Sequence, residues 1–186
     1  VRLLNKKIGG FNSSTPQMTK PSDISSIAEN QVVEKTSPRS QTTVVLGLPA
    51  VNLLSKDRYS FLVLKSYISG FGGPLFRALR GENDLVYATF AFPFLEPEAG
   101  ALLMMAQCYP ENATKVFDEM TNITAEVSFA PLSEKSLMLA KNATLIPYQL
   151  NRQTIQSIAG SAAVWEYRGK GANFGKEFAV RINDVT

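Results

Sequence analysis

GFGGPLFRALRGENDLVY, residues 70–87, is the stretch of this 186-residue chain that constrains its fold most strongly. Glycine is common just after a helix, so Gly70 predicts the end of the helix before it. Pro74 suits the first turn of a short helix through Arg80, because its missing N–H would have no helical partner there. From Leu85 the residues are largely β-branched or aromatic, which predicts a strand. The stretch therefore indicates helix, short helix and strand in close succession.

The glycines of this stretch also permit a second interpretation. A glycine-rich loop before a helix can hold phosphate through its backbone amides. However, no Gly-Lys-Ser or Gly-Lys-Thr follows here, and the glycine spacing is neither Walker-type nor dinucleotide-type. We interpret the loop as a helix-to-helix turn in which glycine lets two backbone segments pass closely.

The same signals predict elements on both sides of this stretch. Expected strands cover residues 42–46, 85–92 and 101–108, and expected helices cover 59–68, 74–80, 110–126, 133–146, 148–167 and 174–182. Asp57 is the expected cap of the first helix, and Pro49, Pro93 and Pro147 are expected to end the elements before them. This order is typical of an α+β architecture in which an antiparallel or mixed sheet packs on helices.

Apolar positions in the later helices predict the residues of the core. Those expected to face it are Val116, Phe117, Met120, Met138, Leu139 and Leu145. Trp165 and Tyr167 are expected to anchor the end of their helix to the core. Cys108 lies in an apolar run without a basic neighbour, so we expect a packed thiol rather than a reactive one.

The first 40 residues differ in composition from the rest of the chain. They are rich in Ser, Thr, Gln, Asn and Lys and are interrupted by prolines. We interpret residues 1–40 as a linker or loosely packed arm, and residues 41–186 as one domain. The chain begins with valine rather than methionine, which suits a piece of a longer polypeptide.

Composition excludes several classes of function. The net charge of +3 is mildly basic, but the cations are spread along the chain, which argues against a nucleic-acid partner. A single cysteine excludes an internal disulfide. No apolar run approaches the roughly 18 residues that a membrane-spanning helix requires, and no signal segment opens the chain. The compartment stays undetermined from sequence, with an intracellular one (cytoplasm or organelle) preferred.

The absence of histidine is the most informative count. It excludes Ser-His-Asp and Cys-His catalysis and every zinc site of the H-x-x-E-H or H-E-x-x-H type. The acidic residues Glu82, Asp84, Glu96 and Glu98 lie at expected turns, where solvated charges are usual. We therefore assign no catalytic residue and no metal or cofactor ligand to this chain.

Short segments spread over residues 41–186 occur in an order known from one peptidase family. They are Leu75-Phe76, Leu79-Arg80 and Tyr87; then Glu98-Ala-Gly-Ala-Leu; then Pro110-Glu-Asn-Ala-Thr-Lys-Val116; then Leu132-Ser-Glu with Ala140-Lys-Asn142; and finally Arg181-Ile-Asn-Asp-Val-Thr186. In this order they resemble the C-terminal, non-catalytic domain of the insulinase/pitrilysin metallopeptidases, the inverted zincins. The resemblance implies a metalloprotease-like αβ-roll domain, here without its last helix.

The resemblance also implies a role for two residues. In the family an arginine and a tyrosine of this domain reach towards the zinc site of the opposite half, and they correspond to Arg80 and Tyr87. The tyrosine would support the oxygen that gains negative charge, and the arginine would hold a substrate carbonyl or carboxylate. Without the resemblance, Arg80 would be an ordinary cation near a helix C-terminus and Tyr87 an ordinary strand aromatic.

Two positions depart from the family pattern. Asp84 stands where glycine is frequent, although aspartate tolerates left-handed backbone geometry better than most residues. Val86 stands where a small residue usually precedes the tyrosine, and its bulk is expected to crowd the cleft.

The resemblance implies a non-catalytic, substrate-binding domain of a zinc metalloendopeptidase that cleaves peptides. The zinc, and the partner that binds it, would belong to another domain or subunit. The alternative is a catalytically inactive scaffold relative of the same family.

Overall fold

Three antiparallel strands carry the fold: β1 (Thr42–Ala50), β2 (Val86–Leu95) and β3 (Gly100–Cys108), in the spatial order β1-β3-β2. This computed structural model describes residues 6, 10 and 30–186. Residues Lys35–Thr186 form one unit, and Val1–Glu34 form another. The expected linker at residues 1–40 lies mostly outside the described residues and stays a prediction.

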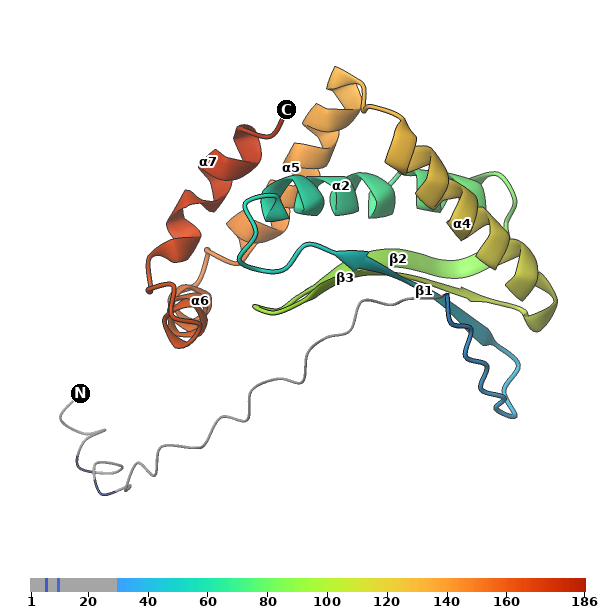
Figure 1. Ribbon diagram of the computed structural model, residues 1–186, viewed down its shortest axis with the longest axis horizontal. Helices are drawn as coiled ribbons and strands as arrows, with labels where there is room; N and C mark the ends of the chain where they lie inside the picture. Colours follow the sequence, from blue (N-terminus) through green and yellow to red (C-terminus); the bar gives the residue numbers. More distant parts are fainter. Residues whose placement is uncertain (1–5, 7–9, 11–29) are drawn as a thin grey trace. The chain divides into compact units, whose positions relative to one another are not determined.

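Helices follow and interrupt these strands. They are α2 (Arg58–Ser69), α3 (Pro74–Phe76), the π-helical turn η1 (Arg77–Gly81), the short η2 (Pro110–Asn112), α4 (Ala113–Phe129), α5 (Glu134–Leu150), α6 (Ile155–Tyr167), η3 (Phe174–Glu177) and α7 (Phe178–Asn183). Figure 1 shows α2, α4 and α5 on the same side of the sheet, with α2 against β2 and α4 against β1 and β3. The predicted α+β class is confirmed, with a purely antiparallel sheet in the described residues.

The main core lies between this sheet and the helices. Along the central strand β3, the alternate residues Leu102, Met104, Ala106 and Cys108 face the helices and are buried. The residues that join them in one buried cluster include Val116, Met120 and Ile123 from α4 and Leu75 and Leu79 from α3 and η1. A second, smaller cluster joins α2, α5 and α7. The sheet therefore buries one face, as the alternation in β3 requires.

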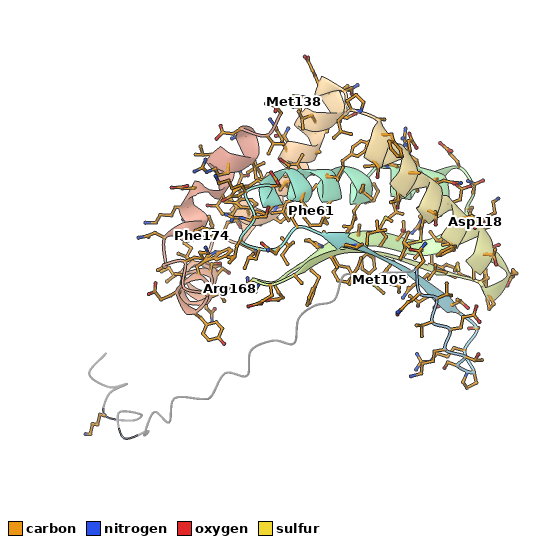
Figure 2. All side chains as sticks on the ribbon, in the orientation of Figure 1. Phe61, Met105, Asp118, Met138, Arg168 and Phe174 are labelled. Atoms are coloured by element: carbon orange, nitrogen blue, oxygen red, sulfur yellow. The ribbon has the colours of Figure 1, made fainter. Side chains whose placement is uncertain are left out.

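The opposite face of the sheet is apolar but stays open in the described unit. Val45, Phe90 and Phe94 are exposed there, and Met105 projects from the side of the sheet away from the helices (Figure 2). A contiguous apolar surface of this kind commonly marks an interaction site. We refer to it as the open sheet face.

The glycine-rich loop is the close backbone passage that the sequence indicates. A Cβ atom on Gly73 would lie 2.3 Å from the Tyr67 carbonyl oxygen, so only glycine fits between α2 and α3. Gly72 has a φ of +80°, which also favours glycine.

Pro49 and Pro93 do not end their strands, contrary to prediction. Both lie inside strands, where Pro49 pairs with Ala101 and Pro93 with Leu102. They are tolerated because β1 and β2 are the edges of the described sheet, where a missing N–H need not break a ladder.

The expected boundary between the later helices is also wrong. Helix α5 continues through Pro147 to Leu150, and the break comes afterwards. Thr154 then begins α6, because its side-chain oxygen accepts a hydrogen bond from the Ser157 amide at 3.2 Å. The cap, rather than the proline, separates the two helices.

Several predicted core residues lie on the surface instead. Phe117, Met138, Leu139 and Tyr167 are exposed, and Tyr167 is 92% exposed. Periodicity identifies an apolar stripe, but the side of a helix that meets the core is decided by its neighbours. Among the helices of the described residues, none is both long and apolar enough to cross a membrane.

Candidate functional site

Arg80 is held at the surface by a turn whose inner side is buried. Leu79, in the same π-helical turn, is fully buried in the main core, whereas Arg80 is exposed. The Leu85 amide donates to the Leu79 carbonyl at 2.7 Å and ties the turn to the start of β2. π-Helical turns are frequent at functional sites because they redirect side chains. Here the turn presents a guanidinium beside the first residues of the strand.

The chain enters β2 through a left-handed residue. Asp84 has a φ of +47°, so the expectation that aspartate would take this geometry is confirmed. Two residues later Val86 is buried in the main core. It does not crowd the neighbouring surface, because its side chain packs under the helices.

Tyr87 occupies an irregularity of the sheet. Val86 pairs with Cys108 and Ala88 pairs with Gln107, so Tyr87 is the extra residue of a β-bulge. A bulge bends its strand and re-aims the side chain of the inserted residue. Tyr87 is 40% exposed, although Val86 beside it belongs to the main core.

The structure brings Arg80 and Tyr87 together and adds Tyr109. The Nη1 group of Arg80 donates a hydrogen bond to the Tyr87 backbone carbonyl. The ring of Tyr109 meets that of Tyr87 edge-on, with 5.1 Å between centroids and 69° between planes. We call these three residues the Arg80–Tyr87–Tyr109 cluster. Sequence reasoning missed Tyr109, because antiparallel register places the residue after Cys108 opposite Leu85 and does not by itself bring it to Tyr87.

The surroundings of Tyr87 raise the pKa of its phenol. Hydrogen bonding with Tyr109 is the largest cause, followed by burial and by the negative charges of Glu111 and Asp84, and together they raise the pKa of Tyr87 to about 12. Near neutral pH the phenol is protonated, as an ordinary tyrosine also is, and can donate its O–H. The cluster offers guanidinium and phenol donors, which suit carbonyl or carboxylate oxygens.

The residues that the structure describes do not fit a zinc ion. The sequence contains no histidine. In the described part of the chain, no group of three or more Cys, Asp or Glu side chains gathers to hold a metal. Arginine has no free electron pair for a metal, so the cluster can act on a substrate but cannot be a metal centre.

Comparisons with known proteins identify the family. A family model described as the peptidase M16 inactive domain matches residues 1–144. A search of curated proteins found no match.

Solved structures with the same fold include peptidase domains. The peptidase M16 inactive domain from Pseudomonas fluorescens superposes with a TM-score of 0.71 and 17% identity over 81% of this chain and 36% of that one. An inactive peptidase domain of a putative zinc protease from Bordetella parapertussis superposes with a TM-score of 0.70 and 18% identity, over 83% of this chain and 84% of that one. Pitrilysin superposes with a TM-score of 0.58 and 15% identity, over 82% of this chain and 16% of that one. This chain therefore spans about a third of the Pseudomonas chain and a smaller part of pitrilysin.

Proposed function

We infer the function of this chain from the fact that it belongs to the peptidase M16 family, as an inactive domain of that family. The resemblance to insulinase and pitrilysin metallopeptidases is thereby confirmed. We propose that the chain is the substrate-binding half of a zinc metalloendopeptidase that cleaves peptides. Since the chain has no histidine and its described residues do not fit zinc, that ion would belong to another domain or subunit.

The observation that carries the proposal is the contact between Arg80 and Tyr87. The Arg80 guanidinium is fastened to the Tyr87 carbonyl, and its other N–H groups remain available to hold a carbonyl or carboxylate of the substrate. The Tyr87 phenol donates its hydrogen to the oxygen of the scissile carbonyl as that oxygen gains negative charge.

The surroundings of the cluster support an extended peptide as the substrate. Tyr87 lies near the start of β2, which is an edge strand of the described sheet. An extended peptide can add to an edge strand as a further strand. In β2 the groups left for it exclude the Tyr87 carbonyl, bonded to Arg80, and the Ala91 amide, which donates to the Ser69 hydroxyl at 2.9 Å. The open sheet face, with exposed Phe90 and Phe94, supplies apolar contacts for alternate side chains of that peptide.

A second candidate function is a scaffold in a larger assembly, without a part in cleavage. The open sheet face favours it, because a broad apolar surface fits a stable protein partner as well as a transient peptide. In that case the Arg80–Tyr87–Tyr109 cluster is a structural contact only.

Steady-state peptide cleavage by the assembled protein, with its zinc-bearing part, separates the two functions. Arg80→Ala and Tyr87→Phe are the test variants, and loss of one transition-state donor lowers kcat about 100-fold or more. Tyr87→Phe should lower kcat, whereas Arg80→Ala should lower kcat and also raise KM. Matched controls are Arg77→Ala, an exposed arginine of the same turn, and Tyr167→Phe, whose side chain is exposed.

The controls should keep full activity, and all four variants should unfold at similar temperatures. If both test variants cleave peptides at the rate of the unmodified protein, the substrate-binding function is rejected and the scaffold function stands. Equal losses in test and control variants would also contradict the role of the cluster.

A further inference from the structure

A cavity of about 390 Å³ lies at the end of β2 remote from Tyr87. Its walls are largely aromatic and aliphatic, and they include Tyr59, Leu62, Phe94, Trp165, Phe174 and Phe178. They come from α2, β2, α6, η3 and α7, so the cavity exists only where these elements meet. Figure 2 labels Arg168 and Phe174 at this end of the domain.

One wall of the cavity holds a buried cation. Arg58, at the start of α2, is only 8% exposed. Its Nη1 donates to the Leu53 carbonyl at 3.2 Å and its Nη2 to the Tyr59 hydroxyl. The guanidinium carbon lies 4.1 Å from the centre of the Tyr59 ring and 4.5 Å from that of Phe174. The guanidinium therefore lies close to two aromatic rings at the cavity.

The charge of Arg58 has no counterion within the described residues. The two ion pairs found there join Arg168 to Glu96 and Arg181 to Glu177. The start of a helix is also unfavourable for a cation, because the partial charge of the helix is positive there. Two acceptors and two rings surround this charge, but burying it without a counterion is still costly, so the arrangement favours an anion at this position. Glu96 also lines the cavity, but its carboxylate pairs with Arg168 at 3.6 Å, and the described residues contain no ion pair between Glu96 and Arg58.

We propose that this cavity binds the C-terminal residue of a peptide, with its carboxylate on Arg58 and its apolar side chain against the aromatic walls. A planar fork of N–H donors is the usual partner of a carboxylate. The side chains of aspartate and glutamate offer a carboxylate but no apolar group for the aromatic walls. An apolar C-terminal residue offers both a carboxylate and an apolar side chain, so it fits the cavity better. That the carboxylate belongs to a peptide rests on the proposed function; binding of an apolar carboxylate does not.

The position of the cavity fits the cluster at the other end of β2. Tyr87 and Phe94 are about seven residues apart on the strand, or roughly 23 Å at about 3.3 Å per residue. An extended peptide anchored in the cavity and aligned with β2 thus reaches Tyr87 about seven residues from its C-terminus.

Trp165 provides the measurement, since it is the only tryptophan of the chain and lines the cavity. Its fluorescence is followed while N-acetylphenylalanine, or its uncharged amide, is added to the full chain. The acid should give a saturable change and bind about tenfold or more tightly than the amide, because one charge-assisted hydrogen-bonded contact is lost in the amide. Acetate, which lacks the ring, should bind much more weakly than the acid.

Variants test the residues involved. Arg58→Gln should weaken binding of the acid about tenfold, whereas Arg152→Gln should leave it unchanged. Arg152 is a matched control, because it also lies over a ring, 5.4 Å from Tyr148, but is exposed and outside the cavity. Glu96→Gln removes a competing carboxylate and should tighten binding of the acid. It tests the proposal even if Arg58→Gln does not fold.

Equal binding of acid and amide, or no saturable change with the acid, would overturn the proposal. So would tighter binding of acetate than of the aromatic acid, which would indicate a simple anion site. The proposed function fails separately, since peptide cleavage that survives Arg80→Ala and Tyr87→Phe rejects it whatever the cavity binds.

Discussion

Replacing Leu79 by alanine tests the structural basis of the candidate site. The Leu79 side chain is fully buried in the main core, and its backbone carbonyl accepts the hydrogen bond from Leu85 that ties η1 to β2. Three carbon atoms are lost at about 0.8 kcal/mol each, and the cavity they leave adds to the cost. We expect the free energy of unfolding to fall by about 3 kcal/mol. For a chain of this length the midpoint of thermal unfolding should fall by about 6–12 °C.

Urea unfolding followed by circular dichroism measures this change. The slope of free energy against urea should stay the same, because the variant exposes the same surface on unfolding. Leu139→Ala is the matched control, since Leu139 is 56% exposed on α5 and its truncation should change stability by no more than about 0.5 kcal/mol. A loss under about 1 kcal/mol at Leu79, or a larger loss at Leu139 than at Leu79, would refute the assignment of the core.

Two further predictions concern the cluster and the last helices. Tyr109→Phe should lower the pKa of Tyr87 from about 12 towards 10, because it removes the largest cause of the shift, and NMR of ¹³C-labelled tyrosine rings measures it. The raised pKa favours the protonated phenol in the folded chain, so its contribution to stability is complete below pH 10 and is lost as pH rises towards 12. The free energy of unfolding of Tyr87→Phe should therefore vary less with pH in this interval than that of the unmodified chain. Equal variation in the two proteins would be evidence against the raised pKa of Tyr87. Thr154→Ala should cost about 1 kcal/mol through loss of the α6 cap, whereas Thr154→Ser should cost little; equal stabilities of the two variants in urea would argue against the cap.

Local chemistry allowed much of the fold to be predicted. Ser133 begins α5 as expected, with its side-chain oxygen accepting from the Ser136 amide at 3.2 Å. Gly70 follows α2, and the glycine-rich loop is the predicted close passage of two backbone segments. These features depend on a few neighbouring residues, so the sequence contains nearly all the information needed to predict them. Pro49, Pro93 and Pro147 were predicted wrongly because the effect of a proline depends on the element around it.

The candidate site was only half predictable. Arg80 and Tyr87 were selected through the family resemblance, and their role stays a proposal. The sequence pattern does not predict that Arg80 lies in a π-helical turn or that Tyr87 lies in a β-bulge. Tyr109 and the cavity around Arg58 were missed altogether, because their neighbours are supplied by other elements.

The sequence by itself determined which chemistry this chain cannot perform. A chain without histidine cannot build the usual zinc sites or a histidine-dependent triad in any fold. It also determined the α+β class, through residue alternation and the signals at helix ends. Tertiary structure alone decided which apolar faces are buried, and it brought Arg58 at the start of α2 against Phe174 of η3. Such contacts depend on how the elements pack, since residues far apart in the chain become neighbours only after the loops between them have closed.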